Sequence, residues 1–203
     1  MKTPRILTFV GGISLGSINK KLFQAVQEIV GDKAELVLAD ISKLPFFSQD
    51  LENDPPDLVT ALKDQIRQAD AVLIITPEYN HSIPAVLKNA IDWGTRPYPQ
   101  NLWEKIPVAI MGASSGNTGT FGAQNHLRQI LSYLNMYILN QPEFYMNGSK
   151  AFNLEGKLVD EKSRKHIEKF WNTFKGWIEK HQPLKTGRPH PSQGLEDSPW
   201  VQH

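Results

Sequence analysis

Cysteine is absent from all 203 residues of the chain. This absence excludes disulfide bonds, iron–sulfur clusters, thiolate zinc sites and a cysteine nucleophile within the sequence. It also fits a reducing compartment. Long hydrophobic runs are scarce as well. The apolar stretch within the N-terminal segment MKTPRILTFVGGIS is too short for a signal peptide or a membrane span. We therefore expect a cytoplasmic protein without a membrane partner.

Neither positive nor negative charge is in excess. The 22 Lys and Arg residues nearly balance the 21 Asp and Glu residues, which leaves a formal net charge of +1. This balance gives no reason to expect a nucleic-acid partner. The six histidines, at positions 81, 126, 166, 181, 190 and 203, lack the paired spacing of metal ligands, so no metal site is expected.

Short apolar runs alternate with helical patterns along most of the chain. We predict strands at 6–10, 34–39, 71–76, 106–111 and 136–139, and helices at 18–30, 57–68, 84–93, 123–135 and 160–180. This alternation predicts an α/β fold, with an open five-stranded parallel sheet covered by helices on both faces. Apolar and aromatic residues recur every three or four positions in the last helix and are interpreted as core packing. One domain is expected over 1–182, followed by a Pro/Gly-rich C-terminal tail over 183–203.

Three loops rich in glycine and polar residues follow strands one, three and four. They are the first loop, GGISLGSIN (11–19), the second loop, PEYNHS (77–82), and the third loop, GASSGNTG (112–119). In a parallel sheet of this type, ligands bind beyond the carboxyl ends of the strands, where the winding reverses. For the strand order 2-1-3-4-5, the three loops share one rim of the sheet. The sequence therefore predicts one ligand site built from three separate segments.

The first loop has the features of a phosphate-binding loop. Gly11, Gly12 and Gly16 allow close backbone approach. Ser17 and Asn19 stand at the start of a helix, whose unpaired N–H groups favour an anion. An equally strong interpretation is that Ser17 only caps the helix.

Two common phosphate-binding motifs do not match the first loop. A Walker loop needs Gly-Lys-Ser/Thr at the helix start, and no lysine stands at that point in Leu15-Gly16-Ser17. The dinucleotide fingerprint G-x-G-x-x-G fails at Gly11-Gly12-Ile13-Ser14-Leu15-Gly16. Asp40, at the end of the second strand, could mimic the ribose-binding acid of that motif, but such an Asp is more often a surface loop residue.

The segment TPEYNHSIPAVLKNAIDW resembles the PEYN segment of the NADPH-dependent FMN reductase family, which includes bacterial quinone, azo and chromate reductases. The first loop is similar to that family's G-S-x-R-x-G-S-x-N, and GASSGNTGTFGAQNHLRQIL is similar to its third loop and the following helix. The resemblance covers about residues 5–180. It implies a flavodoxin-like three-layer sandwich and an enzyme that passes a hydride from NADH or NADPH to bound FMN.

The resemblance also implies which residues contact FMN. The first loop would hold its phosphate, the second loop would line the isoalloxazine ring, and the third would approach the ring or the ribityl chain. Since flavin N5 accepts the hydride, no catalytic side chain is expected. The implied cofactor-binding residues are Gly12, Ile13, Ser14, Leu15, Gly16, Ser17, Ile18, Asn19, Pro77, Glu78, Tyr79, Asn80, Ser114, Ser115 and Gly116.

Individual residues carry further expectations. Gly12 and Ser14 replace the serine and the arginine of the family loop, which predicts a weaker FMN site or a changed nicotinamide preference. Tyr79 is expected to contact the flavin or its substrate. Glu78 is also expected at the flavin, although an outward salt bridge or a charge at a helix N-terminus explains it nearly as well. His126 and Arg128 are interpreted as surface or subunit-contact residues, since the family commonly forms homodimers or homotetramers.

Electrons would pass from the flavin to a small acceptor by a ping-pong mechanism. Quinones, azo compounds, chromate, free flavin and ferric chelates all remain candidates. A flavodoxin-type electron carrier is the main alternative, but such carriers tend to be strongly acidic. A flavin-free dehydrogenase is disfavoured because Tyr145 is followed by Ser149, not Lys150, in the Tyr-x-x-x-Lys spacing. A nonenzymatic oligomerising or regulatory module also remains open.

Overall fold

The computed structural model describes residues 3–116 and 118–181, so the predicted tail over 183–203 lies outside the described residues. The strands are β1 (Arg5–Val10), β2 (Glu35–Leu38), β3 (Ala71–Ile75), β4 (Pro107–Ser114), β5 (Tyr137–Ile138) and β6 (Tyr145–Asn147). The first five are parallel neighbours in the order β2-β1-β3-β4-β5. This order confirms the predicted α/β topology.

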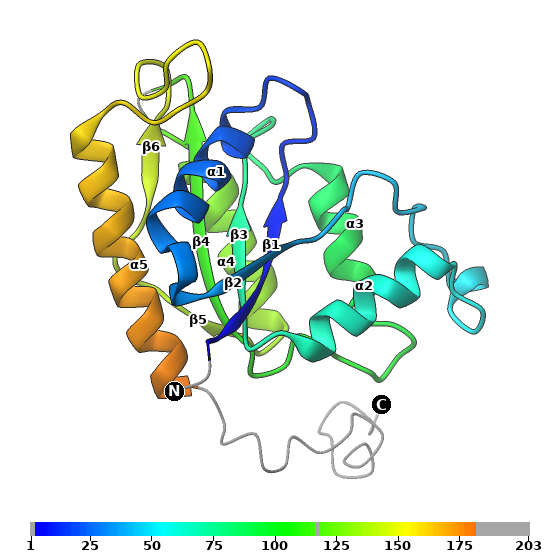
Figure 1. Cartoon of the computed structure of the whole chain (residues 1–203). Coiled ribbons are helices and arrows are strands. Elements are labelled where there is room, and N and C mark those ends of the chain that lie inside the picture. Colours follow the sequence, from blue (N-terminus) through cyan, green and yellow to red (C-terminus); the bar gives the residue numbers. More distant parts are fainter. Residues whose placement is uncertain (1–2, 117, 182–203) are drawn as a thin grey trace.

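Helices cover both faces of this sheet (Figure 1). The core on one face includes α1 (Ile18–Val30) and α5 (Glu161–His181). The core on the other face includes α2 (Asp57–Gln68), α3 (Ala85–Trp93) and α4 (Phe121–Tyr133). Two short 3-10 turns, Gly31–Lys33 and Gln49–Leu51, complete the set of regular elements. The three-layer sandwich expected from the family resemblance is therefore present.

Packing on the α5 face confirms the predicted aromatic stripe. Phe170, Trp171 and Phe174 are each at most 3% exposed, and they belong to the same core as β1, β3 and β4. Trp177 is half-buried and donates its Nε1–H to the carbonyl oxygen of Tyr137 at 2.8 Å. Burying several large aromatic side chains on one helix contributes strongly to docking that helix on the sheet.

Three predicted boundaries near the site are wrong. β4 continues through Ser114 because β6, which the sequence analysis missed, pairs with residues 112–114. The first three residues of the predicted third loop are therefore strand. α4 starts at Phe121 instead of Ala123, and the preceding Thr120 is its N-cap residue. Pro84 precedes α3 as its N-cap and is not in its first turn.

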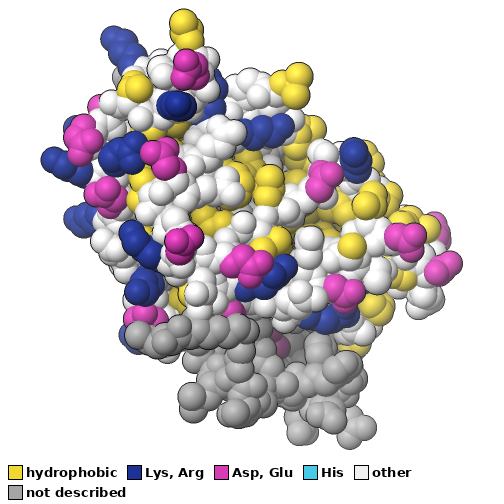
Figure 2. Space-filling view, in the orientation of Figure 1, with side chains coloured by type: hydrophobic (Ala, Val, Ile, Leu, Met, Phe, Trp, Pro, Cys, Tyr) yellow, Lys and Arg dark blue, Asp and Glu magenta, His cyan; other side chains and the backbone are white. Residues whose placement is uncertain are grey.

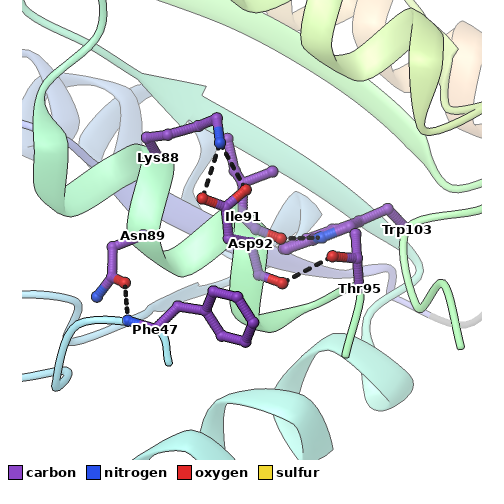
Figure 3. Close-up of polar contacts among 7 residues, drawn as sticks. All are labelled: Phe47, Lys88, Asn89, Ile91, Asp92, Thr95 and Trp103. Atoms are coloured by element: carbon purple, nitrogen blue, oxygen red, sulfur yellow. Dashed lines mark hydrogen bonds and ion pairs between the residues drawn. The ribbon is translucent and has the colours of Figure 1, made fainter. Parts of the chain in front are cut away.

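The long segment between β2 and α2 is fastened to α3. The backbone N–H of Phe47 donates to Asn89 Oδ1 at 2.8 Å, as Figure 3 shows. The Pro45 carbonyl oxygen accepts hydrogen bonds from Asn89 Nδ2 and Trp93 Nε1, both at 2.9 Å. These bonds give fixed positions to a segment that has little regular structure of its own.

Of the helices in residues 3–116 and 118–181, none combines the length and apolar character needed to cross a bilayer.

Candidate functional site

The carboxyl ends of β1, β3 and β4 bring the three loops to one rim. The backbone N–H of Gly11 donates to the Ile75 carbonyl oxygen at 2.9 Å, and Thr76 N–H donates to the Met111 carbonyl oxygen at 3.0 Å. These bonds extend the strand ladders to the points where the first and second loops leave the sheet. The rim lies at the position that a reversal of winding between β1 and β3 creates.

Ser17 stands at the N-cap position of α1, but its side chain makes no capping hydrogen bond within the described chain. The interpretation that Ser17 only caps the helix is therefore wrong. Its hydroxyl instead occupies the space that a Cβ on Gly12 would fill. The loop thus turns a hydroxyl and the open N-terminus of α1 toward the same side, an arrangement suited to a phosphate.

The Asn19 side chain is bound within the chain. It is 2% exposed, and its amide donates to the Ala113 carbonyl oxygen and accepts from Ala113 N–H, both at 2.9 Å. Both ends of the amide are therefore used to fix α1 against β4. Only the backbone N–H of Asn19, in the first turn of the helix, remains available to a phosphate.

The second loop is a tight two-residue turn. Tyr79 and Ser82 exchange two backbone hydrogen bonds of 3.0 Å each. Between them, Asn80 and His81 have φ angles of 51° and 60°, which is the backbone pattern of a type I′ hairpin turn. The turn leaves Tyr79 52% exposed at the rim, so its ring is accessible to a ligand.

The Glu78 side chain lies on the N-terminus of α4. Its Oε2 accepts the Ala123 N–H at 3.0 Å, and its Oε1 lies 3.0 Å from His81 Nδ1. A carboxylate there is stabilised by the unpaired N–H groups of the helix. Both explanations left open for Glu78 are therefore observed, the charge at a helix N-terminus and the outward contact with His81. A contact of Glu78 with the flavin stays a prediction.

A second contact ties the same loop to α4. Ser82 Oγ lies 2.7 Å from His126 Nδ1, so His126 is a partner of the second loop within its own chain. Together with Glu78, this contact holds the turn at two points along α4. Arg128 lies further along that helix and donates from Nη1 to the Leu139 carbonyl oxygen at 3.3 Å.

The third loop brings small polar groups to the rim. Ser114 ends β4, and its Oγ accepts the Gly116 N–H at 3.1 Å. Ser115 and Gly116 are exposed. Gly112 is required at the base of this segment, because a Cβ there would overlap with Thr120 Oγ1 and the Thr76 carbonyl oxygen. The chain can therefore leave β4 directly beside the second loop.

Sequence reasoning missed two contributions to this rim. The turn after β6 joins it, since Gly148 N–H donates to the Ser114 carbonyl oxygen at 2.8 Å; the dipeptide Asn147-Gly148 was the signal for such a turn. Lys20 donates from Nζ to the Ile13 carbonyl oxygen at 2.8 Å, which places a cation beside the first loop. A lysine in the first turn of α1 gave no signal by itself.

The residues at this rim fit a flavin nucleotide. The first loop offers a hydroxyl, backbone N–H groups and a helix N-terminus to a phosphate. Exposed aromatic side chains, Tyr79 at 52% and Phe121 at 53%, suit a flat aromatic ring, because ligand sites combine apolar walls with a few polar groups. The geometry can hold and orient such a ligand.

Comparison with known proteins points to the same chemistry. The family model for NADPH-dependent FMN reductases matches residues 4–151. A 2-hydroxy-1,4-benzoquinone reductase of a Burkholderia species is 40% identical over 175 residues, which is 86% of this chain and 96% of that protein. The solved flavoenzyme FerB, an NAD(P)H:(acceptor) oxidoreductase from Paracoccus denitrificans, matches with a TM-score of 0.85 and 40% identity over 89% of this chain and 100% of that one. An archaeal flavodoxin, 8% identical with a TM-score of 0.56 over 86% of this chain and 99% of that one, shares the fold.

Proposed function

The chain belongs to the NADPH-dependent FMN reductase family, and we propose that it reduces small quinones with electrons from NAD(P)H. It is an oxidoreductase that uses FMN and NAD(P)H. The observation that carries the quinone assignment is the 40% identity, over 96% of its length, to a 2-hydroxy-1,4-benzoquinone reductase. The accessible Tyr79 ring at the rim supports it, because a flat acceptor can stack there.

In this proposal, each loop contacts a different part of FMN. The phosphate lies against the first loop, residues 12–19, with Ser17 Oγ and the first backbone N–H groups of α1 as donors. Asn19 takes part through its backbone alone, since its side chain is bound to Ala113. The ring lies between the second loop, residues 77–80, and the third, residues 114–116. Backbone groups of Glu78 and Asn80 meet its polar edge.

FMN held by these loops would supply the redox chemistry, a hydride transfer from the nicotinamide and a two-electron transfer to the acceptor. The chain's own residues bind and orient the reactants, and no side chain is assigned a proton-transfer step. The nicotinamide and the quinone use one pocket in turn, beside Tyr79. This shared pocket predicts ping-pong kinetics.

The site is proposed to work in a cytoplasmic homodimer or homotetramer. NAD(P)H is a cytoplasmic reductant, which supports the compartment. Exposed aromatic side chains support an interface: Phe46 is 74% exposed, Tyr98 is 60% exposed and Tyr133 is 73% exposed. Aromatic residues are enriched at protein–protein interfaces.

Anaerobic reduction of the bound flavin tests the proposal. Protein reconstituted with FMN is mixed with NADH or NADPH, and flavin absorbance is followed before and after addition of 1,4-benzoquinone. We expect bleaching on addition of nicotinamide and return of the colour on addition of quinone. A flavodoxin-type carrier would stay yellow until a separate reductase was added, and that result would reject the proposal. Initial rates at several fixed quinone concentrations should give the parallel double-reciprocal lines of a ping-pong mechanism.

A further inference from the structure

A cavity of about 630 Å³ lies beside the first loop, on the side away from the second and third loops. It opens between α1 and the end of β2. Lys20, Phe23 and Gln24 line it from α1, Ile13 lines it from the first loop, and residues 38–42 line it from the end of β2 and the segment that follows. The cavity and the proposed flavin site therefore share one wall, the first loop, along the same rim of the sheet.

The floor of this cavity is apolar. Phe23 and Ile41 are 6% and 3% exposed beneath it, whereas Leu38 and Ile13 remain 49% and 46% exposed around it. Figure 2 shows hydrophobic side chains exposed in a hollow on this face of the molecule. Exposed aliphatic side chains around a cavity of this size are typical of a site for a flat apolar group.

Polar groups stand at defined positions around that floor. Asp40 Oδ1 accepts from Ser42 N–H at 3.1 Å and from Ser42 Oγ at 2.6 Å. These bonds lower the pKa of Asp40, so the carboxylate is ionised at neutral pH. Its Oδ2 makes no hydrogen bond within residues 3–116 and 118–181, and can accept one from a ligand. Lys20, bound to the Ile13 carbonyl oxygen, places a cation between the cavity and the first loop.

The wall that carries Asp40 is held in place from both sides. Before it, Ala39 N–H donates to the Thr8 carbonyl oxygen at 2.9 Å, which continues the β1–β2 ladder. After it, the Pro45 carbonyl oxygen accepts from Asn89 Nδ2 of α3, and Phe47 N–H donates to Asn89 Oδ1 (Figure 3). The cavity is therefore formed without a ligand, which lowers the cost of ordering the segment on binding.

We propose that this cavity binds the adenosine half of NADH. The adenine lies on the apolar floor, the ribose hydroxyls donate to Asp40, and Lys20 faces the diphosphate. The assignment rests on the proposed function, because the nicotinamide must reach the flavin across the first loop. An acid at the end of the strand next to β1 bonds ribose hydroxyls in dinucleotide-binding folds, and the same carboxylate repels the 2′-phosphate of NADPH.

The test compares NADH with reduced nicotinamide mononucleotide, which lacks the adenosine half. The measured quantity is the second-order rate constant for anaerobic bleaching of the bound flavin. Asp40→Asn removes the charge that would strengthen the hydrogen bonds from the ribose hydroxyls. We expect about a tenfold loss with NADH, no change with the mononucleotide, and a smaller ratio of NADH to NADPH rates. Asp32→Asn, an exposed carboxylate outside the cavity, is the matched control.

A second variant blocks the cavity without touching its charge. Gln24→Trp should reduce the NADH rate and spare the mononucleotide, whereas Gln129→Trp, an exposed position on α4, should affect neither. Equal effects on both reductants, or none on NADH, would overturn the assignment. AMP can also be added to the reaction with NADH. If AMP binds to the protein but leaves the NADH rate unchanged, the assignment is overturned, since the cavity would then serve a free nucleotide. If neither reductant bleaches the wild-type flavin, the proposed function fails instead.

Discussion

The first and second loops meet at one rim but are built in opposite ways. The second loop is held by its own turn and by contacts from Glu78 and Ser82 to α4. The first loop leaves Leu15 fully exposed and Ile13 46% exposed, and the Ser17 side chain makes no cap bond within the described chain. The wall proposed for the flavin ring is thus complete before a ligand arrives. The phosphate side has donors that an anion would satisfy.

The largest expected effect on stability comes from removing the Asn19 side chain, whose hydrogen bonds to Ala113 hold α1 against β4. Asn19→Ala leaves the N–H and C=O groups of Ala113 buried without their partner, and each such group costs about 1–3 kcal/mol. We expect the free energy of unfolding to fall by about 2–4 kcal/mol, measured by urea denaturation. Asn125→Ala, an exposed position on α4, should change it far less. Equal losses in the two variants would mean that Asn19 does not anchor α1.

A smaller effect is expected from pushing the second loop off α4. A Cβ on Gly122 would lie 3.0 Å from Glu78 Oε1 and 3.2 Å from Oε2, so Gly122→Ala forces the carboxylate away from Ala123 N–H. Loss of the hydrogen bond from Ala123 N–H to Glu78 should lower the free energy of unfolding by about 1 kcal/mol. This loss offsets the gain in helix propensity that alanine brings.

Gly176 is the matched control, because a Cβ added there would meet no atom of the described chain within 4 Å beyond its own neighbours and the backbone of its own helix turn. Gly176→Ala in α5 should stabilise the protein by about 0.5–1 kcal/mol. Thermal unfolding of both variants measures the difference. If Gly122→Ala stabilises as much as Gly176→Ala does, the Glu78 contact is not what holds the second loop.

The smallest effect is expected from adding charge to the open first loop. Ser14→Arg restores the cation of the family pattern, and an exposed ion pair contributes about 0.2–1 kcal/mol. We expect FMN to dissociate about two- to fivefold less readily at low salt, measured by fluorescence quenching, with the gain lost at high salt. Ser132→Arg on the exposed side of α4 should leave affinity unchanged. Tighter binding in both variants would contradict a local role for position 14.

Local patterns predicted the elements that frame the site. α1 and α2 have the predicted bounds, 18–30 and 57–68, because an amphipathic period of 3.6 residues is a strong signal. β6 was missed because it has three residues and pairs with Gly112–Ser114, where no alternation of apolar residues marks a strand. Its partner lies more than 30 residues earlier in the chain, which a local pattern cannot show.

The sequence predicted which loops form the site more accurately than it predicted what the side chains of those loops contact. The order of the strands brings the three loops together, so their convergence followed from topology. The actual tasks of Asn19 and Glu78 depend on partners 94 and 45 residues away. Glycine and proline patterns mark where the backbone turns, whereas the direction of a polar side chain is decided by such distant partners.

The relative affinity of the protein for FMN and riboflavin tests the account most directly. The two ligands share the ring that the second and third loops would contact, and only FMN carries the phosphate assigned to the first loop. Hydrogen bonds to a charged phosphate contribute about 1.5–3 kcal/mol each, so FMN should bind at least about tenfold more tightly, and Ser17→Ala should narrow that ratio. Equal affinities for FMN and riboflavin would contradict a phosphate site at the first loop.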